Sequence, residues 1–276
     1  MAFLRSRRGD RAGDLAYRQG TSQPSQLTRS RTADRLPVLP PRILPCGDAA
    51  VSVEFGDAID PGLNARVLAL DEALRRAAPK GVVETVPTYR SLLVHFDPLA
   101  TDHDALTAFL EEQARSVAPL ESTGRRWRVP VVYGGAFGED LDDLAGAHGL
   151  TAAEVIERHA GAVYRIYMIG FLPGFAYLGG LDPALATPRR TQPRARIPAG
   201  SVAIGGAQTA ISSIEGPSGW HLLGRTPVRS YDPGREPAFL LAAGDEVVFE
   251  PVDPSRWDDF ERAAQAGQPV AEQVHP

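Results

Sequence analysis

Arginines cluster shortly after an unusual segment in the second half of the sequence. The segment GFLPGFAYLGG, at residues 170–180, contains four glycines and three aromatic residues. Guanidinium groups bind carboxylates and phosphates through paired, charge-assisted hydrogen bonds, and glycine lets a ligand approach the backbone closely. This combination indicates an apolar groove with an anion-binding rim; the alternative is a tightly turned barrel corner whose arginines lie in solvent. The arginines in question are Arg189, Arg190, Arg194 and Arg196.

The walls and turns of such a groove can be assigned from the same stretch. Phe171, Phe175 and Tyr177 alternate around a Pro-Gly pair and would line the apolar side. Proline fixes the backbone and glycine permits left-handed conformations, so residues 198–200 and 217–219 would each form a rigid turn.

The motifs argue against several kinds of self-contained chemistry. The sequence has no phosphate-binding G-x-x-x-x-G-K-[ST] loop and no G-x-S-x-G nucleophile elbow. Cys46 is the only cysteine, and no two histidines have the spacing of ligands on one helix, so we expect no metal site. Ser212 and Ser213 are interpreted as structural strand residues, and His221 as a surface or satisfied histidine. The sequence alone therefore names no catalytic residue.

Composition places the chain among globular proteins. Of its 276 residues 43% are hydrophobic and 23% charged, and the net charge of −5 gives no case for nucleic-acid binding. No apolar run approaches the roughly 20 residues that a membrane span needs, so we expect no membrane association. The single cysteine suits a reducing cytoplasm. Residues 1–38 are rich in arginine and lack an apolar stretch, which predicts a disordered basic extension rather than a secretory signal.

A first domain is predicted at residues 39–122. Its first helix opens at Asp60-Pro61, an acidic N-cap followed by proline at the first helical position. The order strand, helix, strand, strand, helix indicates a small antiparallel sheet covered by helices. The predicted strands are 50–55, 82–89 and 91–97, and the second helix is 102–116.

A second, β-rich domain is predicted at residues 123–270. A strand at 127–135 is followed by two short helices, the second of which opens with Thr151 and Glu154 as a capping box. Between residues 163 and 251 short alternating runs, ending with AFLLAA and EVVFEP, are separated by Gly, Pro and Asp. This is the pattern of a β-sandwich or barrel. A closing helix is predicted at 255–267.

Several longer motifs agree with a known family. They are GFLPGFAYLGGLDPALATPRRTQPRARIPAGSVAIGG, GPSGWHLLGRTP and LAAGDEVVF, with upstream agreement in LPCGDAAVSVEFGD and VPVVYGGAFGEDLDDLA. With these motifs the sequence resembles the KipI family over roughly residues 41–255. The resemblance implies an α+β protein, with a small N-terminal α/β sandwich domain followed by a C-terminal cyclophilin-like β-barrel.

The same resemblance implies a function. The KipI family includes the B subunit of the prokaryotic 5-oxoprolinase and proteins labelled allophanate hydrolase subunit 1. The resemblance implies a hydrolase subunit that opens 5-oxo-L-proline to L-glutamate with ATP hydrolysis, active only with a homologous C subunit and an A subunit. ATP with Mg²⁺ is then expected at the level of the complex, with no cofactor assigned to this chain. Two alternatives stay open: an inhibitor of a sensor histidine kinase, and an allophanate hydrolase or urea carboxylase type of subunit.

The resemblance also implies which residues bind the substrate. The chain departs from the family at residues 210–213, where a tyrosine is usual, and at 216–220, where the family reads SPGGW, so the wall of the groove differs here. Phe175 and Trp220 would cover the substrate ring, and Gln208 would donate to a carbonyl. The implied substrate-binding residues are Phe175, Tyr177, Arg189, Arg190, Gln208, Trp220 and Arg225, and the implied turn residues are Gly170, Pro173, Gly174, Pro198, Gly200 and Gly224.

Overall fold

The computed structural model describes residues 40–119 and 124–275. Each of the two described ranges has its own hydrophobic core. The extension predicted at residues 1–38 and the domain boundary predicted at 122–123 lie outside the described residues.

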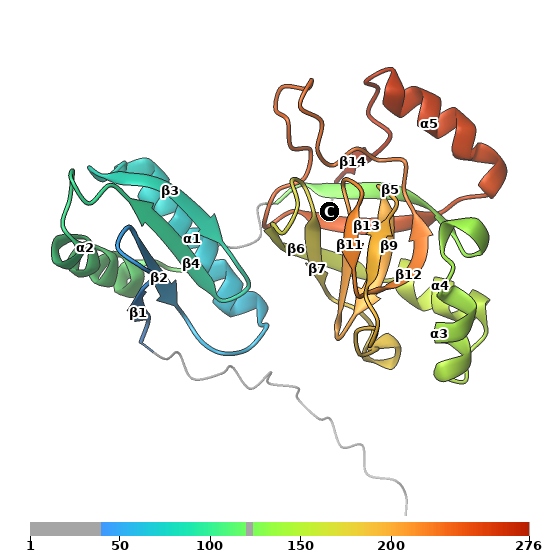
Figure 1. The fold of residues 1–276 in the computed structure, drawn as a ribbon, viewed down its shortest axis with the longest axis horizontal. Helices are drawn as coiled ribbons and strands as arrows, with labels where there is room; N and C mark the ends of the chain where they lie inside the picture. Colours follow the sequence, from blue (N-terminus) through green and yellow to red (C-terminus); the bar gives the residue numbers. More distant parts are fainter. Residues whose placement is uncertain (1–39, 120–123, 276) are drawn as a thin grey trace, which may run out of the picture. The chain divides into compact units, whose positions relative to one another are not determined.

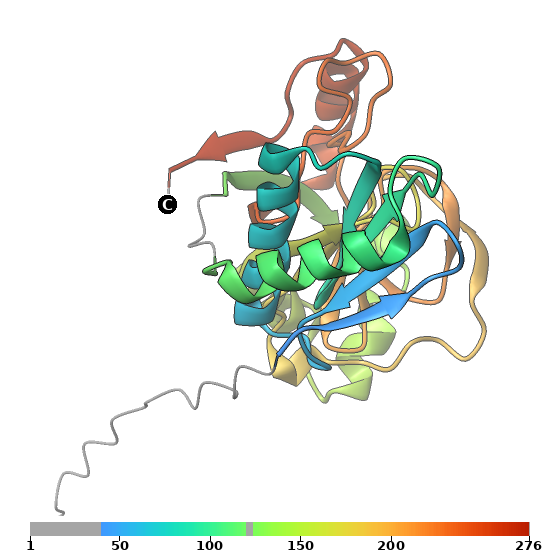
Figure 2. The same cartoon turned by 90° about the vertical axis from the view of Figure 1, so that its left-hand side faces the viewer.

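Within residues 40–119, four antiparallel strands form a sheet with two helices on one face (Figures 1 and 2). Helix α1 begins where the sequence predicts, because Asp60 accepts a hydrogen bond from the Leu63 amide at 2.9 Å and Pro61 occupies the first turn. The first strand has no counterpart in the prediction. The elements, with sheet order β1-β2-β4-β3, are β1 (Arg42–Pro45), β2 (Ala50–Glu54), α1 (Pro61–Ala77), β3 (Val82–Pro87), β4 (Ser91–Phe96) and α2 (His103–Ser116).

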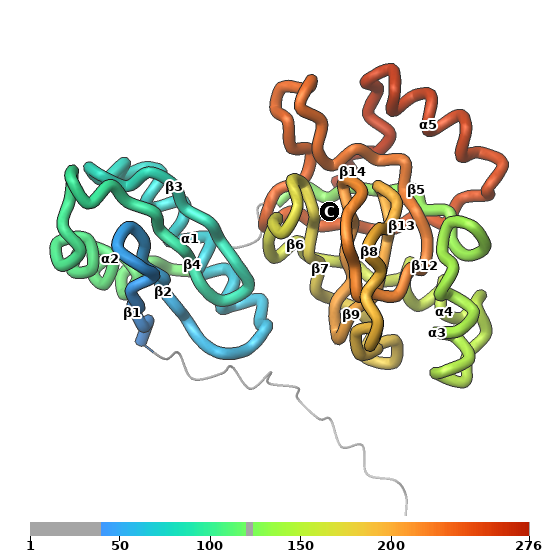
Figure 3. The backbone as a smooth tube through the Cα atoms, viewed as in Figure 1, coloured from blue at the N-terminus to red at the C-terminus, as the bar shows by residue number. Residues whose placement is uncertain are grey.

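Within residues 124–275, most of the strands belong to one closed β-barrel (Figures 1 and 3). The strands and helices are β5 (Arg126–Tyr133), α3 (Leu141–Ala147), α4 (Ala152–Ala160), β6 (Val163–Ile169), β7 (Ala176–Gly179), β8 (Arg194–Ile197), β9 (Ser201–Gly205), β10 (Gln208–Ile211), β11 (Gly216–Ser218), β12 (His221–Arg225), β13 (Glu246–Pro251), α5 (Trp257–Gln265) and β14 (Glu272–Val274). The strand order is β12-β9-β10-β7-β6-β13-β5, and the pairing of β12 with β5 closes the ring. Strand β14 adds to β5, while β8 and β11 pair with each other. The α+β class with a C-terminal barrel is confirmed.

Helix α4 packs a histidine into the barrel core. Thr151 and Glu154 form the predicted capping box, in which each side chain accepts from the other residue's backbone amide. His159 on the last turn is fully buried and stacks on Phe249 at a centroid distance of 4.9 Å. Its ring nitrogens are hydrogen-bonded to the side-chain oxygens of Tyr133, at 2.8 Å, and Thr209, at 2.9 Å. This polar network ties the helix to the barrel wall.

Two predictions near the C-terminus differ from the structure. The run at residues 238–243 is not a strand and makes only an isolated bridge between Phe239 and Tyr231. The Arg235 guanidinium donates hydrogen bonds to the carbonyl of Pro237, just before this run, and to that of Ala238, its first residue, and so holds the start of the run in a folded loop. Strand β14 lies beyond the predicted domain end at residue 270. In the two described ranges, no α-helix is long and apolar enough to cross a membrane.

Candidate functional site

A groove of about 190 Å³ lies at the predicted aromatic segment of the barrel. Phe171 and Phe175 come from the loop before β7, and Tyr177 lies on β7 itself. Trp220 directly precedes β12, and Arg189 lies in the loop that leads to β8. Segments far apart in the sequence thus share one concave surface, whose remaining lining is Pro193 and residues 217–219. The prediction of a turn at 217–219 is wrong, because residues 217 and 218 lie on β11, which pairs with β8.

The aromatic wall of the groove is part of the core. Phe175 and Trp220 are only 6% and 5% exposed and belong to one buried cluster. The ring of Tyr177 packs 4.7 Å from that of Phe175 and edge-on to that of Trp220 at 5.9 Å. Phe171 is different, because it is 62% exposed and meets Phe175 only with its edge. The deep wall is therefore rigid, and Phe171 forms an open rim.

Arg189 is the cation that this groove presents. Its guanidinium lies over the indole of Trp220, 5.5 Å from the ring centroid, and makes no ion pair or hydrogen bond with the described residues. Burial raises the pKa of the Tyr177 phenol, and the positive charge of Arg189 partly offsets that rise. An arginine without a carboxylate partner beside an apolar groove is suited to bind an anion.

The three neighbouring arginines are already neutralised. Arg190 and Arg194 both pair with Asp140, at 2.9 and 2.7 Å. Arg194 also contacts Glu139 at 2.9 Å, and Arg196 pairs with exposed Glu215. Of the four arginines predicted to form the rim, only Arg189 therefore has no carboxylate partner among the described residues.

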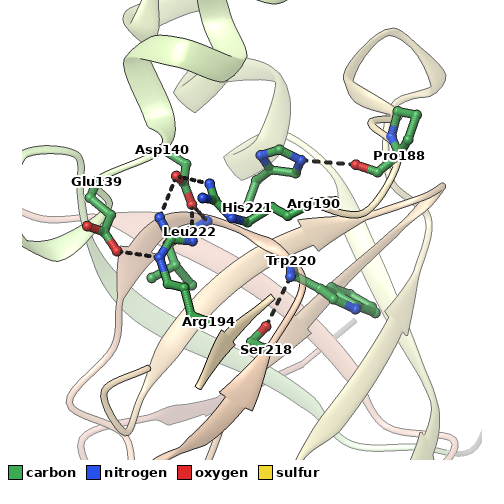
Figure 4. Close-up of polar contacts among 9 residues, drawn as sticks. All are labelled: Glu139, Asp140, Pro188, Arg190, Arg194, Ser218, Trp220, His221 and Leu222. Carbon is green, nitrogen blue, oxygen red and sulfur yellow. Dashed lines mark hydrogen bonds and ion pairs between the residues drawn. The ribbon is translucent and has the colours of Figure 1, made fainter. Parts of the chain in front are cut away.

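Asp140 organises these contacts, and no motif in the sequence indicated this role (Figure 4). Its carboxylate, 4% exposed, accepts hydrogen bonds from Arg190, from both terminal nitrogens of Arg194 and from the backbone amide of Leu222. Burial alone would raise the pKa of this carboxyl, but the bonds from Arg194 and Leu222 and the charges of both arginines hold it below its usual value. The charged carboxylate thus joins the loop before β8 to strand β12.

Two further contacts hold the residues on either side of Arg189, and Figure 4 draws the one between His221 and Pro188. The backbone amide of Arg190 donates to the carbonyl of Gly219 at 2.7 Å. The Nε2 atom of His221 lies 3.0 Å from the carbonyl of Pro188, so that nitrogen carries the hydrogen and donates it. Arg189 is therefore held against the turn that carries Trp220. His221 has a structural partner, in agreement with its interpretation as a satisfied histidine.

The structure does not bring all predicted site residues to the groove. Arg225 donates to the carbonyl of Ala199 at 3.1 and 3.2 Å and lies over the ring of Trp257. It lines a separate cavity of about 300 Å³, and burial lowers the pKa of its guanidinium. Gln208 is buried at the start of β10, opposite Gly205, and does not line the groove. Of the residues predicted to bind substrate, those that line the groove are Phe175, Tyr177, Arg189 and Trp220.

The predicted turn residues have several structural roles. Gly200 has φ of +77°, and a Cβ there would lie 2.0 Å from the carbonyl of Thr226, so glycine is required. Gly174 has φ of +72° within the loop before β7. Gly224 lies within β12, where it pairs with Tyr133 at the closure of the barrel rather than in a turn. The carbonyl of Pro173 accepts a hydrogen bond from Ser213, while Gly170 and Pro198 lie in connections between strands.

Curated relatives match most of the chain. The B subunit of 5-oxoprolinase from Bacillus subtilis (strain 168) is 37% identical over 214 residues, which are 74% of this chain and 89% of that protein. The B subunit of 5-oxoprolinase from Escherichia coli O157:H7 is 39% identical over 206 residues, 74% of this chain and 93% of that protein. These matches agree with the resemblance found in the motifs.

Solved structures and a family model agree with the fold. The crystal structure of TTHA0988 superposes with a TM-score of 0.67 at 39% identity over 74% of this chain, which spans only 40% of the length of that protein. Urea carboxylase of Kluyveromyces lactis shares the fold, with a TM-score of 0.73 at 21% identity over 87% of this chain and 25% of that one. The model of the carboxyltransferase domain, subdomain C and D, matches residues 41–241. The chain therefore belongs to the family of carboxyltransferase domains of subdomain C and D type.

Proposed function

We propose that this chain is the B subunit of an ATP-dependent 5-oxoprolinase, a hydrolase that opens the lactam of 5-oxo-L-proline to L-glutamate. Relatives named as the B subunit of 5-oxoprolinase are 37–43% identical to the chain. Members of the same family occur within longer chains, since the matched region spans 40% of TTHA0988. This supports the proposal that the subunit acts with others, namely an A subunit and a homologous C subunit.

The observation that carries the substrate assignment is the position of the Arg189 guanidinium above an aromatic groove, with no ion-pair partner among the described residues. 5-Oxo-L-proline is a small five-membered ring with one carboxylate. In the proposed complex Arg189 binds the carboxylate by charge-assisted hydrogen bonds, and the apolar wall that contains Phe175 and Trp220 lies against the ring. Because these two rings are buried in the core, the site is formed before the ligand arrives and costs little ordering on binding.

The ATP-dependent part of the reaction is proposed to take place on the partner subunits. No cluster of three or more carboxylate, imidazole or thiol side chains that could hold a metal ion is found among the described residues. The cation that lines the groove, Arg189, is already assigned to the substrate carboxylate. These residues do not fit an ATP–magnesium site, so no catalytic step on this chain is assigned to ATP.

The test is ATP-dependent consumption of 5-oxo-L-proline by the complex reconstituted from the A, B and C subunits. The substitution Arg189→Ala should lower kcat/KM by an order of magnitude or more, because a charge-assisted hydrogen bond contributes about 1.5–3 kcal/mol. The matched control is Arg196→Ala, which removes an arginine of the same segment that pairs with Glu215 outside the groove. Unchanged turnover in Arg189→Ala would remove this residue from the site. Turnover of allophanate in place of 5-oxo-L-proline would overturn the assignment in favour of the urea-linked alternative.

A further inference from the structure

Ser218 places a hydroxyl group in the wall of the groove. The residue ends strand β11 and lines the groove together with Arg189 and Trp220. Its Oγ accepts a hydrogen bond from the backbone amide of Trp220 at 3.1 Å (Figure 4). A serine hydroxyl has one hydrogen to donate besides its acceptor lone pairs. Among the described residues that hydrogen has no acceptor, so the hydroxyl is available to donate to a ligand.

The position of this hydroxyl oxygen is set by the protein rather than by the ligand. The amide of Trp220 belongs to the turn that also binds the backbone of Arg190 and, through His221, the carbonyl of Pro188. The anchored donor and the cation Arg189 are therefore attached to the same turn. Two other donors in the wall, the Tyr177 hydroxyl and the indole nitrogen of Trp220, make no hydrogen bond with the described residues. Among these three groups only the Ser218 hydroxyl is anchored by a hydrogen bond to the protein and still has a hydrogen to donate.

We infer that Ser218 is a specificity-determining residue, whose hydroxyl donates a hydrogen bond to the ring carbonyl of a ligand that Arg189 binds by its carboxylate. The inference rests on the proposed function, because it concerns the same groove. A cation and a neutral donor in one small groove select a cyclic carboxylate that also carries a carbonyl oxygen. A cyclic carboxylate without that carbonyl oxygen leaves the Ser218 hydroxyl without an acceptor and binds with one hydrogen bond fewer.

A simpler role for Ser218 makes a different prediction. If its oxygen only accepted from the Trp220 amide, its removal would disturb the turn and weaken every ligand of the groove equally. If its hydrogen pairs with a carbonyl, its removal weakens only ligands that carry one. The ratio of affinities for ligands with and without a carbonyl therefore separates the two roles.

The experiment measures dissociation constants of the full-length chain by titration calorimetry. The three probes are 5-oxo-L-proline, the carbocyclic ketone 3-oxocyclopentanecarboxylate and cyclopentanecarboxylate, which lacks the carbonyl. Ser218→Ala should weaken the first two by about two- to tenfold, the range of one neutral hydrogen bond, and leave the third unchanged within about twofold. Ser218→Thr, which keeps the hydroxyl, should retain the selectivity.

The outcomes that overturn the inference differ from those that overturn the proposed function. Equal weakening of all three probes in Ser218→Ala, or no weakening, overturns the role of Ser218 alone if Arg189→Ala still abolishes binding of all three. If Tyr177→Phe selectively weakens the two probes that carry a carbonyl and Ser218→Ala does not, the donor is Tyr177 and the inference about Ser218 is overturned. Failure of the unmodified chain to bind any of the three, with no effect of Arg189→Ala on turnover by the complex, overturns both.

Discussion

Replacement of Asp140 by alanine tests whether one buried carboxylate holds the groove together. The substitution removes the acceptor of Arg190, Arg194 and the Leu222 amide at once. Removing one member of a buried ion pair costs about 3–5 kcal/mol, and a buried amide left without an acceptor costs about 1–3 kcal/mol. The two terms overlap, and Arg190 and Arg194 are 31% and 20% exposed at their side chains, so water recovers part of the loss. We expect a destabilisation of about 3–4 kcal/mol.

The assay for Asp140→Ala is urea unfolding of the full-length chain followed by tryptophan fluorescence. All three tryptophans lie in the C-terminal range, at positions 127, 220 and 257, so the signal reports on the barrel. The matched control is Glu139→Ala, whose 57% exposed carboxylate pairs only with Arg194 among the described residues and should contribute less than about 1 kcal/mol. A loss below about 1 kcal/mol in Asp140→Ala, or one equal to that of Glu139→Ala, would refute the reasoning.

Two further predictions concern stability. Burial lowers the pKa of His159 to about 3. Below about pH 6.5 this histidine therefore binds a proton in the unfolded chain but not in the native chain. Stability should therefore fall by up to about 1.4 kcal/mol per pH unit as the pH decreases from 6.5 towards 3, and a His159→Asn variant should lose this part of the slope in urea unfolding at pH 7, 6 and 5. Gly200→Ala forces a left-handed backbone on alanine and a contact with the Thr226 carbonyl, and should lower the free energy of unfolding by at least about 1–3 kcal/mol. Gly146→Ala, in helix α3 with open space around it, should instead be neutral or stabilise by up to about 1 kcal/mol, and equal effects of the two glycine variants would contradict the argument.

Local features were predicted well because their causes are local. The N-cap at Asp60 and the capping box of Thr151 and Glu154 each satisfy backbone amides within one helical turn. Alternation of apolar residues likewise placed β2 and β13. The run at 238–243 was predicted wrongly as a strand. Hydrogen bonds from the Arg235 side chain hold its start in a loop, and the alternation of apolar residues does not reveal such bonds.

The closure of the barrel could not be read from alternation. Strand β5 pairs in parallel with β13, more than a hundred residues later, and antiparallel with β12. Pairing partners at that separation depend on the register of the whole ring. The alternation of apolar residues therefore predicted a sandwich or a barrel without deciding between them. The resemblance to a family indicated the barrel.

The order of residues is enough to reveal a glycine- and aromatic-rich corner followed by arginines, and motifs that belong to a family. Which of these arginines is left to bind an anion depends on the folded chain. Asp140 lies 50 residues from Arg190 in the chain, yet their side chains are 2.9 Å apart. Ion pairs of this kind form only after the barrel has brought the start of α3, the loop before β8 and strand β12 together, so the availability of Arg189 is a property of the fold.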